Sequence, residues 1–210
     1  MGMIARCIMG FAGHMIDDPQ RPVPRFPPAA EPMVRSAIRE CLERYQPEIA
    51  LSSAACGGDI IFAEEAIELK IPIYIILPFE DIGEFITQSV SFPKDGKRWV
   101  KRFYNVLKGA KQIFYVNPGT YDSPKDFEET QHAIIFFSLG LQETLKIQIV
   151  NIILYDDLDP TSKKTGGTNS FLELCEQLKK LNLERLEDFF VINEKIDMGK
   201  IRRQMDDQDN

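Results

Sequence analysis

The chain has 210 residues, of which 44% are hydrophobic and 27% are charged, values typical of one globular domain with a sizeable core. No apolar run reaches the length of a membrane span and the first residues hold no long apolar segment, so we expect neither a membrane partner nor a signal peptide. The net charge of −7 leads us to expect no nucleic-acid partner, because such binding needs Lys and Arg to neutralise phosphates.

Short apolar runs alternate with amphipathic segments along the chain. The apolar runs predict strands at 4–9, 49–52, 71–77, 112–116, 147–155 and 189–192. Apolar residues at helical spacing predict helices at 31–45, 60–69, 80–90, 96–109, 126–145 and 170–181. This order predicts an α/β fold, namely a Rossmann-like three-layer sandwich whose mostly parallel sheet is covered by helices on both faces. We expect one domain over 1–192 and a polar C-terminal tail over 193–210 that is either frayed or weakly helical.

A glycine-containing turn and a long loop follow the first predicted strand. Gly13 and His14 stand in the turn, and the loop to the next helix contains five prolines, which reduce the entropy lost when it becomes ordered. We expect this loop to act as a lid or clamp, with Arg21 and Arg25 on phosphate or carboxylate oxygens. His14 and Asp17 would hold a ribose hydroxyl or polarise a reacting group. Alternatively, the loop only covers the sheet edge and Arg25 pairs with a structural carboxylate.

A second turn joins the predicted strand 49–52 to the next helix. Gly57 and Gly58 permit a sharp reversal and the close approach of another molecule, and the helix that follows offers amides to an anion. Asp59 is expected either to cap this helix or to bind a ribose or base. Ser53 is a candidate donor to the ligand. Cys56 is either a nucleophile activated by the helix N-terminus or, as we prefer, a small buried residue of the pocket wall.

A third turn precedes the predicted helix 170–181. Gly166 and Gly167 offer backbone amides, and Thr168 and Ser170 offer hydroxyls, which together predict a phosphate cradle. Glu173 lies one turn into the helix and would reach a ribose or act as a general base. The alternative is an ordinary capped helix start with a solvated Glu173.

The three turns all follow predicted parallel strands, and in such sheets ligands bind beyond the carboxyl ends of the strands. We therefore expect them to share one pocket. The two histidines show no metal-binding spacing, and we expect no metal and no cofactor. Four cysteines without CxxC spacing predict reduced thiols and a cytoplasmic location. The segment 133–137 is apolar on more than one side of its helix, which predicts either a deeply buried helix or, as we prefer, a homodimer contact.

Segments 10–14, 53–59 and 166–173 together resemble the SLOG superfamily, the Rossmann-like group that joins SMF/DprA proteins with LOG phosphoribohydrolases. The closest likeness is to SLOG-type sensor domains of bacterial signalling and anti-phage proteins. The resemblance implies binding or sensing of a nucleotide-derived ligand, such as a nucleotide or nucleotide-sugar phosphate, at the strand ends. It also implies an alternative, a LOG-like enzyme that cleaves the N-glycosidic bond of a nucleoside monophosphate with Glu173 as the catalytic residue. Asn169 stands where the LOG motif has its third Gly, which favours binding over hydrolysis.

Overall fold

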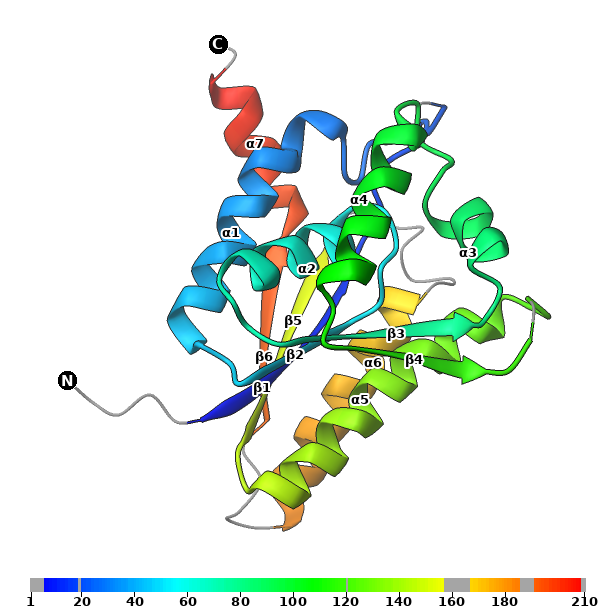
Figure 1. Cartoon of the computed structure of the whole chain (residues 1–210). Helices are drawn as coiled ribbons and strands as arrows, with labels where there is room; N and C mark the ends of the chain where they lie inside the picture. Colours follow the sequence, from blue (N-terminus) through cyan, green and yellow to red (C-terminus); the bar gives the residue numbers. More distant parts are fainter. Residues whose placement is uncertain (1–5, 19, 120, 157–166, 186–190, 209–210) are drawn as a thin grey trace.

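The computed structural model describes residues 6–18, 20–119, 121–156, 167–185 and 191–208. In this part of the chain, six parallel strands form one sheet in the order β4-β3-β2-β1-β5-β6 (Figure 1). The strands are β1 (Cys7–Gly13), β2 (Ile49–Ser52), β3 (Ile73–Phe79), β4 (Gln112–Asn117), β5 (Gln148–Tyr155) and β6 (Val191–Asp197). The helices are η1 (Pro28–Ala30), α1 (Glu31–Tyr45), α2 (Gly58–Glu68), α3 (Ile82–Ser89), α4 (Gly96–Gly109), α5 (Lys125–Leu145), α6 (Gly167–Arg185) and α7 (Met198–Gln208).

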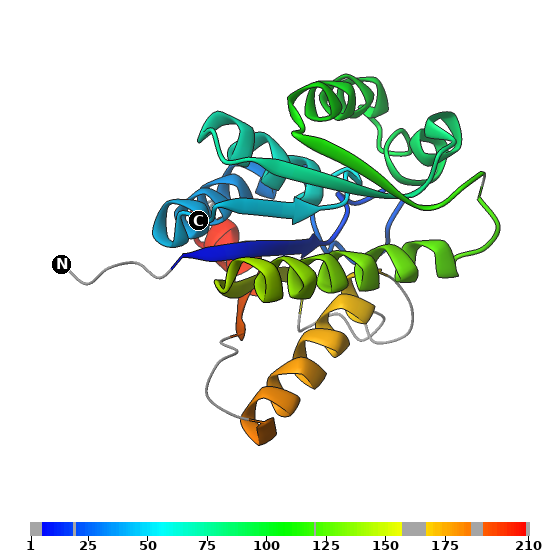
Figure 2. The same ribbon diagram turned by 60° about the horizontal axis from the view of Figure 1, so that its bottom comes forward.

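The helices form two layers around the sheet. Helices α1, α2, α4 and α7 pack on one face, and α5 and α6 pack on the other, as Figure 2 shows. The central strands β1 and β5 are buried along nearly their whole length, as expected of parallel strands covered on both faces. These observations confirm the predicted Rossmann-like three-layer fold.

The direction of strand addition reverses between β1 and β5. Strands β2, β3 and β4 are added in sequence on one side of β1, whereas β5 and β6 lie on its other side. The pairing of β1 with β5 runs from Cys7 opposite Gln148 to Gly13 opposite Leu154. In open α/β sheets such a reversal leaves a crevice at the carboxyl ends of the two strands, where ligands usually bind.

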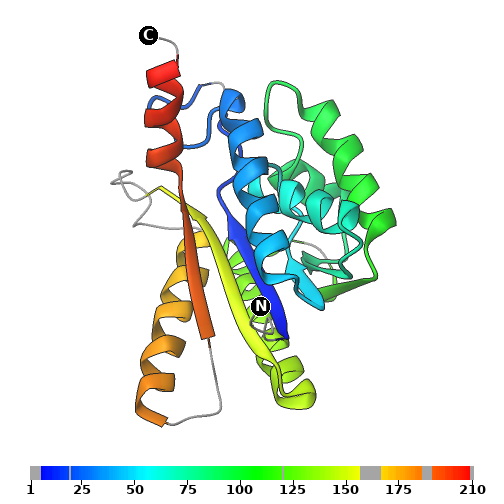
Figure 3. The same cartoon turned by 90° about the vertical axis from the view of Figure 1, so that its left-hand side faces the viewer.

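The structure differs from the sequence prediction at both ends of the chain. The predicted first turn, residues 10–13, belongs to β1. The predicted polar tail is ordered as the end of β6 and as α7 (Figure 3), with Met198 and Ile201 buried in the core. Its apolar residues are sparse among many charges, but they fall on one side of the helix, which suffices for packing. The division of the chain into a single domain stays a prediction.

The structure also bears on two other features of the sequence, namely the length of its apolar helices and the apolar segment 133–137. No helix in the described ranges is both long and apolar enough to cross a membrane. In the apolar segment of α5, Ile134 and Ile135 are buried against the sheet, and Phe137 packs its ring 4.6 Å from that of Phe114. Phe136 is 62% exposed. Packing within the chain therefore accounts for most of the apolar excess from which a homodimer contact was predicted.

Candidate functional site

A cavity of about 360 Å³ lies at the carboxyl ends of β1 and β2, beside the reversal of strand order. Its volume falls within the range of small-molecule sites. Six regions of the chain contribute to its wall: the end of β1, the proline-rich loop, the β2–α2 turn, the end of α3, the first two turns of α5 and the first turn of α6. The lining residues are Gly13, His14, Met15, Arg25, Ser53, Ala55, Asp59, Gln88, Ser89, Pro124, Phe127, Glu128, Gln131, Gly167, Thr168 and Asn169.

The structure brings parts of all three predicted turns to this cavity. Gly13 comes from the first turn, Asp59 from the second and Thr168 from the third. Arg25 of the proline-rich loop joins them. These positions match the sequence expectation that the turns share one pocket. Whether the lining residues bind a ligand stays a prediction.

Several predicted site residues lie elsewhere. Cys56, Gly57 and Gly58 are buried and are not among the lining residues. Glu173 is exposed and also absent from the lining, so a catalytic role for its carboxylate in this cavity is not supported. Ser170 is hydrogen-bonded to His132 of α5, with 2.9 Å between Oγ and Nε2, and thereby links α5 to α6. Gly166 lies outside the described residues.

The glycines of the second turn serve packing within the chain. The amide of Gly58 donates to the carbonyl of His14 at 3.1 Å, and Met15 forms an antiparallel bridge with Gly57. A Cβ on Gly58 would stand 3.1 Å from the Cα of Gly13, closer than ordinary contact. For Gly58, the expectation that this helix start binds an anion through its amides therefore needs correction, because that amide is already bonded to His14.

Asp59 is the most perturbed acid of the cavity. Its side chain is 4% exposed, and Oδ1 accepts a hydrogen bond from the amide of Gly13 at 3.1 Å. Burial raises the pKa of Asp59 to about 7, although hydrogen bonds from Gly13, Ser53 and Ala55 lower it. Desolvation thus outweighs the hydrogen bonds. Near neutral pH this carboxyl is partly protonated, which reduces its repulsion of an anionic ligand.

His14 joins the cavity wall to the end of β5. Its Nε2 accepts a hydrogen bond from the backbone amide of Asp156 at 3.1 Å, and its ring packs 5.3 Å from that of Tyr155. Because the ring is 3% exposed, this geometry fits a positioning role for His14 better than proton exchange with solvent. The imidazole holds β1 and β5 together at the point where the strand order reverses.

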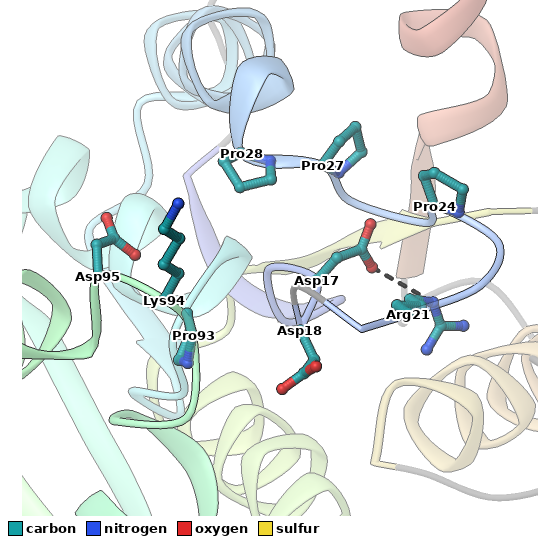
Figure 4. Close-up of a pocket in the computed structure, with 9 residues that line it drawn as sticks. All are labelled: Asp17, Asp18, Arg21, Pro24, Pro27, Pro28, Pro93, Lys94 and Asp95. Carbon is teal, nitrogen blue, oxygen red and sulfur yellow. Dashed lines mark ion pairs between the residues drawn. The ribbon is translucent and has the colours of Figure 1, made fainter.

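Asp17 and Arg21 line a second cavity of about 540 Å³, whose wall includes several residues of the proline-rich loop (Figure 4). Its remaining lining residues are Asp18, Pro24, Pro27, Pro28, Pro93, Lys94 and Asp95. Asp17 Oδ2 accepts from the amide of Arg25 at 2.8 Å, and its Oδ1 lies 3.4 Å from Nε of Arg21. Asp17 therefore closes the loop on itself, which argues against the predicted role of its carboxylate as a ribose ligand.

Sequence reasoning missed the contribution of α5 to the first cavity. Phe127, Glu128 and Gln131 line it from the first two turns of this helix. Gln131 is 8% exposed, and its Oε1 is buried without a hydrogen-bond partner. No local motif marks these residues, since they reach the cavity only because α5 crosses the sheet from β4 to β5. Among the described residues, no cluster of His, Cys, Asp and Glu suits a metal ion.

The fold and the cavity define a Rossmann-like α/β protein with a candidate ligand site at its topological switch point. No protein-family model and no curated protein matches the chain. Among solved structures, the chain is similar to DNA processing protein A from Helicobacter pylori, a structure described for its unique single-stranded DNA binding mode. The TM-score is 0.37 and the identity 15%, over 97% of this chain and 82% of that chain. The SLOG resemblance stays a prediction.

The expectation of no nucleic-acid partner needs correction; the similar solved structure is described as binding single-stranded DNA, a statement about that protein. The exclusion was drawn from the net charge of −7. That number is a sum over the whole chain, whereas exposed charges are screened beyond about 8 Å at physiological salt. Net charge therefore does not report what a single local surface of the protein can bind.

Proposed function

We propose that the 360 Å³ cavity binds a nucleotide-derived ligand and that the protein senses this ligand rather than hydrolysing it. The observation that carries the proposal is the meeting of the first turn of α6 with Arg25 in one cavity at the switch point of a parallel sheet. A helix N-terminus stabilises an anion through its free amides and dipole. An arginine adds charge-assisted hydrogen bonds to a phosphate.

The rest of the lining suits a nucleoside. The ring of Phe127 offers a surface on which a base can stack. The side-chain amide of Gln131, whose Oε1 has no hydrogen-bond partner, can accept from or donate to the edge of a base. The half-buried carboxylate of Glu128 suits a ribose hydroxyl and not a phosphate, so we assign the phosphate to the α6 end of the cavity.

Sensing is preferred to hydrolysis because of Glu173. In the hydrolytic alternative this carboxylate stabilises the developing positive charge on the sugar or activates water, which requires it to reach the ligand. Its side chain is exposed and does not line the cavity. The arrangement therefore supports binding without N-glycosidic cleavage.

Titration calorimetry with AMP, GMP, CMP and UMP tests the proposal, with inorganic phosphate and a short single-stranded oligonucleotide as further probes. We expect at least one mononucleotide to bind. Arg25→Ala should weaken that binding roughly tenfold or more, since hydrogen bonds to charged groups contribute about 1.5–3 kcal/mol. Lys94→Ala, which removes an exposed cation from the second cavity, is the matched control and should have no effect.

Three outcomes contradict the proposal. The first is the absence of binding for all four mononucleotides. The second is equal weakening by Arg25→Ala and Lys94→Ala, which would place the ligand outside the assigned cavity. The third is tight binding of the oligonucleotide without binding of any mononucleotide, which would indicate a nucleic-acid surface.

A further inference from the structure

Arg202 of α7 contacts two segments that meet beside the cavity. Its Nη1 donates to the carbonyl of Pro24 at 2.7 Å and to that of Arg25 at 3.0 Å. The same nitrogen pairs with the carboxylate of Asp156, directly after β5. One guanidinium thus joins the C-terminal helix, the proline-rich loop and the end of β5, as the neighbouring positions of α7 and this loop in Figure 3 illustrate.

The contacts with Pro24 and Arg25 fasten the loop to the body of the protein. The loop already closes on itself, because Asp17 accepts from the amide of Arg25 at 2.8 Å and donates its own amide to the carbonyl of Phe26 at 2.9 Å. Arg202 donates to the carbonyls of Pro24 and Arg25, which belong to this closed part of the loop. The backbone of Arg25, whose side chain lines the cavity, is therefore held from both sides.

The contact with Asp156 extends the connection to a second wall of the cavity. Asp156 is 1% exposed, so its carboxylate depends on neighbouring cations and donors for stabilisation. Its backbone amide donates to Nε2 of His14 at 3.1 Å, and His14 lines the cavity. Arg202 therefore contacts one lining residue, Arg25, and the hydrogen-bond partner of another, His14, while lying outside the lining itself.

We propose that Arg202 is a positioning residue, which holds Arg25 at the cavity so that docking of α7 sets the affinity for the ligand. The claim about affinity rests on the proposed function, whereas the claim about the loop does not. If α7 undocked, the loop would lose the hydrogen bonds that Arg202 donates to Pro24 and Arg25, and the guanidinium of Arg25 would spend less time in the binding position. Coupling of this kind is reciprocal, so a bound ligand should also stabilise the docked α7.

The first experiment tests the loop without any ligand. Trypsin cleaves after arginine, and the bond between Arg25 and Phe26 is a site within the loop, whereas Arg21 precedes a proline and is a poor site. In the intact protein Phe26 is fully buried, so cleavage at 25–26 should be slow. We expect Arg202→Ala to accelerate it roughly tenfold, equivalent to a loss of about 1.4 kcal/mol of local stability.

Arg203→Ala is the matched control, because Arg203 is the next residue of α7 and forms a 3.8 Å ion pair with Asp197 rather than with the loop. It should leave the cleavage rate unchanged. Arg202→Lys retains a cation near the three acceptors and should restore part of the protection. Hydrogen exchange in β2 and β3 reports whether the Ala variant keeps its fold. Equal cleavage rates in folded Arg202→Ala and Arg203→Ala overturn the proposal.

The second experiment measures the affinity for AMP, GMP, CMP and UMP in the same variants. We expect a loss for Arg202→Ala of the same order as that for Arg25→Ala, and none for Arg203→Ala. If the loop is released in Arg202→Ala but the affinity is unchanged, the positioning role is wrong and the proposed function stands. If no mononucleotide binds the unaltered protein, the proposed function fails, and faster cleavage in Arg202→Ala would still support the role of Arg202 in holding the loop.

Discussion

The carboxylate of Asp59 accepts a hydrogen bond from the backbone amide of Gly13, with 3.1 Å between N and Oδ1. This bond joins the end of β1 to the first turn of α2, two segments that are 46 residues apart. Because of this bond, Oδ1 of Asp59 is already occupied by a partner within the chain, although the residue still lines the cavity. Asp59 is therefore a structural link between two walls of the cavity, and its contact with a ligand stays a prediction.

Asp59 should make the stability of the protein depend on pH. Its pKa is raised from 3.8 to about 7 on folding, chiefly by burial. Between these values the native state binds more protons than the unfolded state, so the free energy of unfolding falls as the pH rises from about 4 to about 7 and levels off above. The full effect is about 4 kcal/mol at 1.36 kcal/mol per pKa unit.

Urea unfolding at pH 5 and pH 8 measures this dependence. Asp59→Asn should reduce the difference in the free energy of unfolding between these two pH values. The stability of this variant relative to the unaltered protein should increase as the pH rises. Asp122→Asn, at an exposed position, should keep the original slope. An Asp59→Asn variant with the original slope would show that this carboxyl is not the group responsible.

Gly57 should tolerate no side chain. Its φ of 104° is in a region that favours glycine, and a Cβ would lie 2.5 Å from the backbone nitrogen of Ile16. We expect Gly57→Ala to lower the free energy of unfolding by about 1–3 kcal/mol or more. Gly140→Ala is the control, because its Cβ would meet nothing within 4 Å in α5 and should stabilise the helix by about 0.5–1 kcal/mol. Equal effects in the two variants would contradict the observed packing of the β2–α2 turn.

Arg102 should stabilise the layer formed by α1, α2 and α4. It pairs with Glu31 and Glu64, each at 2.7 Å, and its guanidinium lies 3.9 Å from the ring centroid of Trp99. Arg102→Ala removes one of the cations that these carboxylates share, whereas Arg35 and Arg98 remain, and should cost about 2 kcal/mol in thermal or urea unfolding. The neighbouring exposed Lys101, changed to Ala, should cost no more than about 0.5 kcal/mol. A small effect at both positions would show that the ion pairs are dispensable.

Removing the Glu173 carboxylate should change neither nucleotide binding nor the expected absence of base release. We expect no free base when the protein is incubated with the four nucleoside monophosphates and the mixture is separated by chromatography. Glu173→Ala should bind them as the unaltered protein does, since this side chain does not line the cavity. Base release that disappears in Glu173→Ala would restore the hydrolytic alternative.

Local patterns in the sequence predict the layers of this fold well. The helices at Glu31–Tyr45 and Gly96–Gly109 agree with their predicted bounds, because each has a regular apolar side that packs on the sheet. Helix α7 was foreseen only as the weakly helical alternative to a frayed tail, because its few apolar residues are surrounded by charges. It gains its stability from packing against the core rather than from its own sequence.

For a related reason, the sequence predicts only part of the candidate site. Turns after parallel strands point to Gly13, Asp59 and Thr168, since the architecture brings such turns to one edge. The positions of Gln131 and Arg202 depend on how α5 and α7 cross the sheet, which no local motif records. A pair of glycines in the sequence also does not show which group will pack against it. At Gly58 the neighbouring group is Gly13 of the same chain, not a ligand.

The most direct test of the central claim is a nitrogen-15 NMR titration with AMP, GMP, CMP and UMP. It follows backbone amides at both cavities at once. If the claim is correct, the amides of Gly13, Gly167 and Thr168 shift with a common saturation curve, while those of Lys94 and Asp95 stay in place. Shifts confined to Lys94 and Asp95, or no shifts with any of the four nucleotides, would contradict the account.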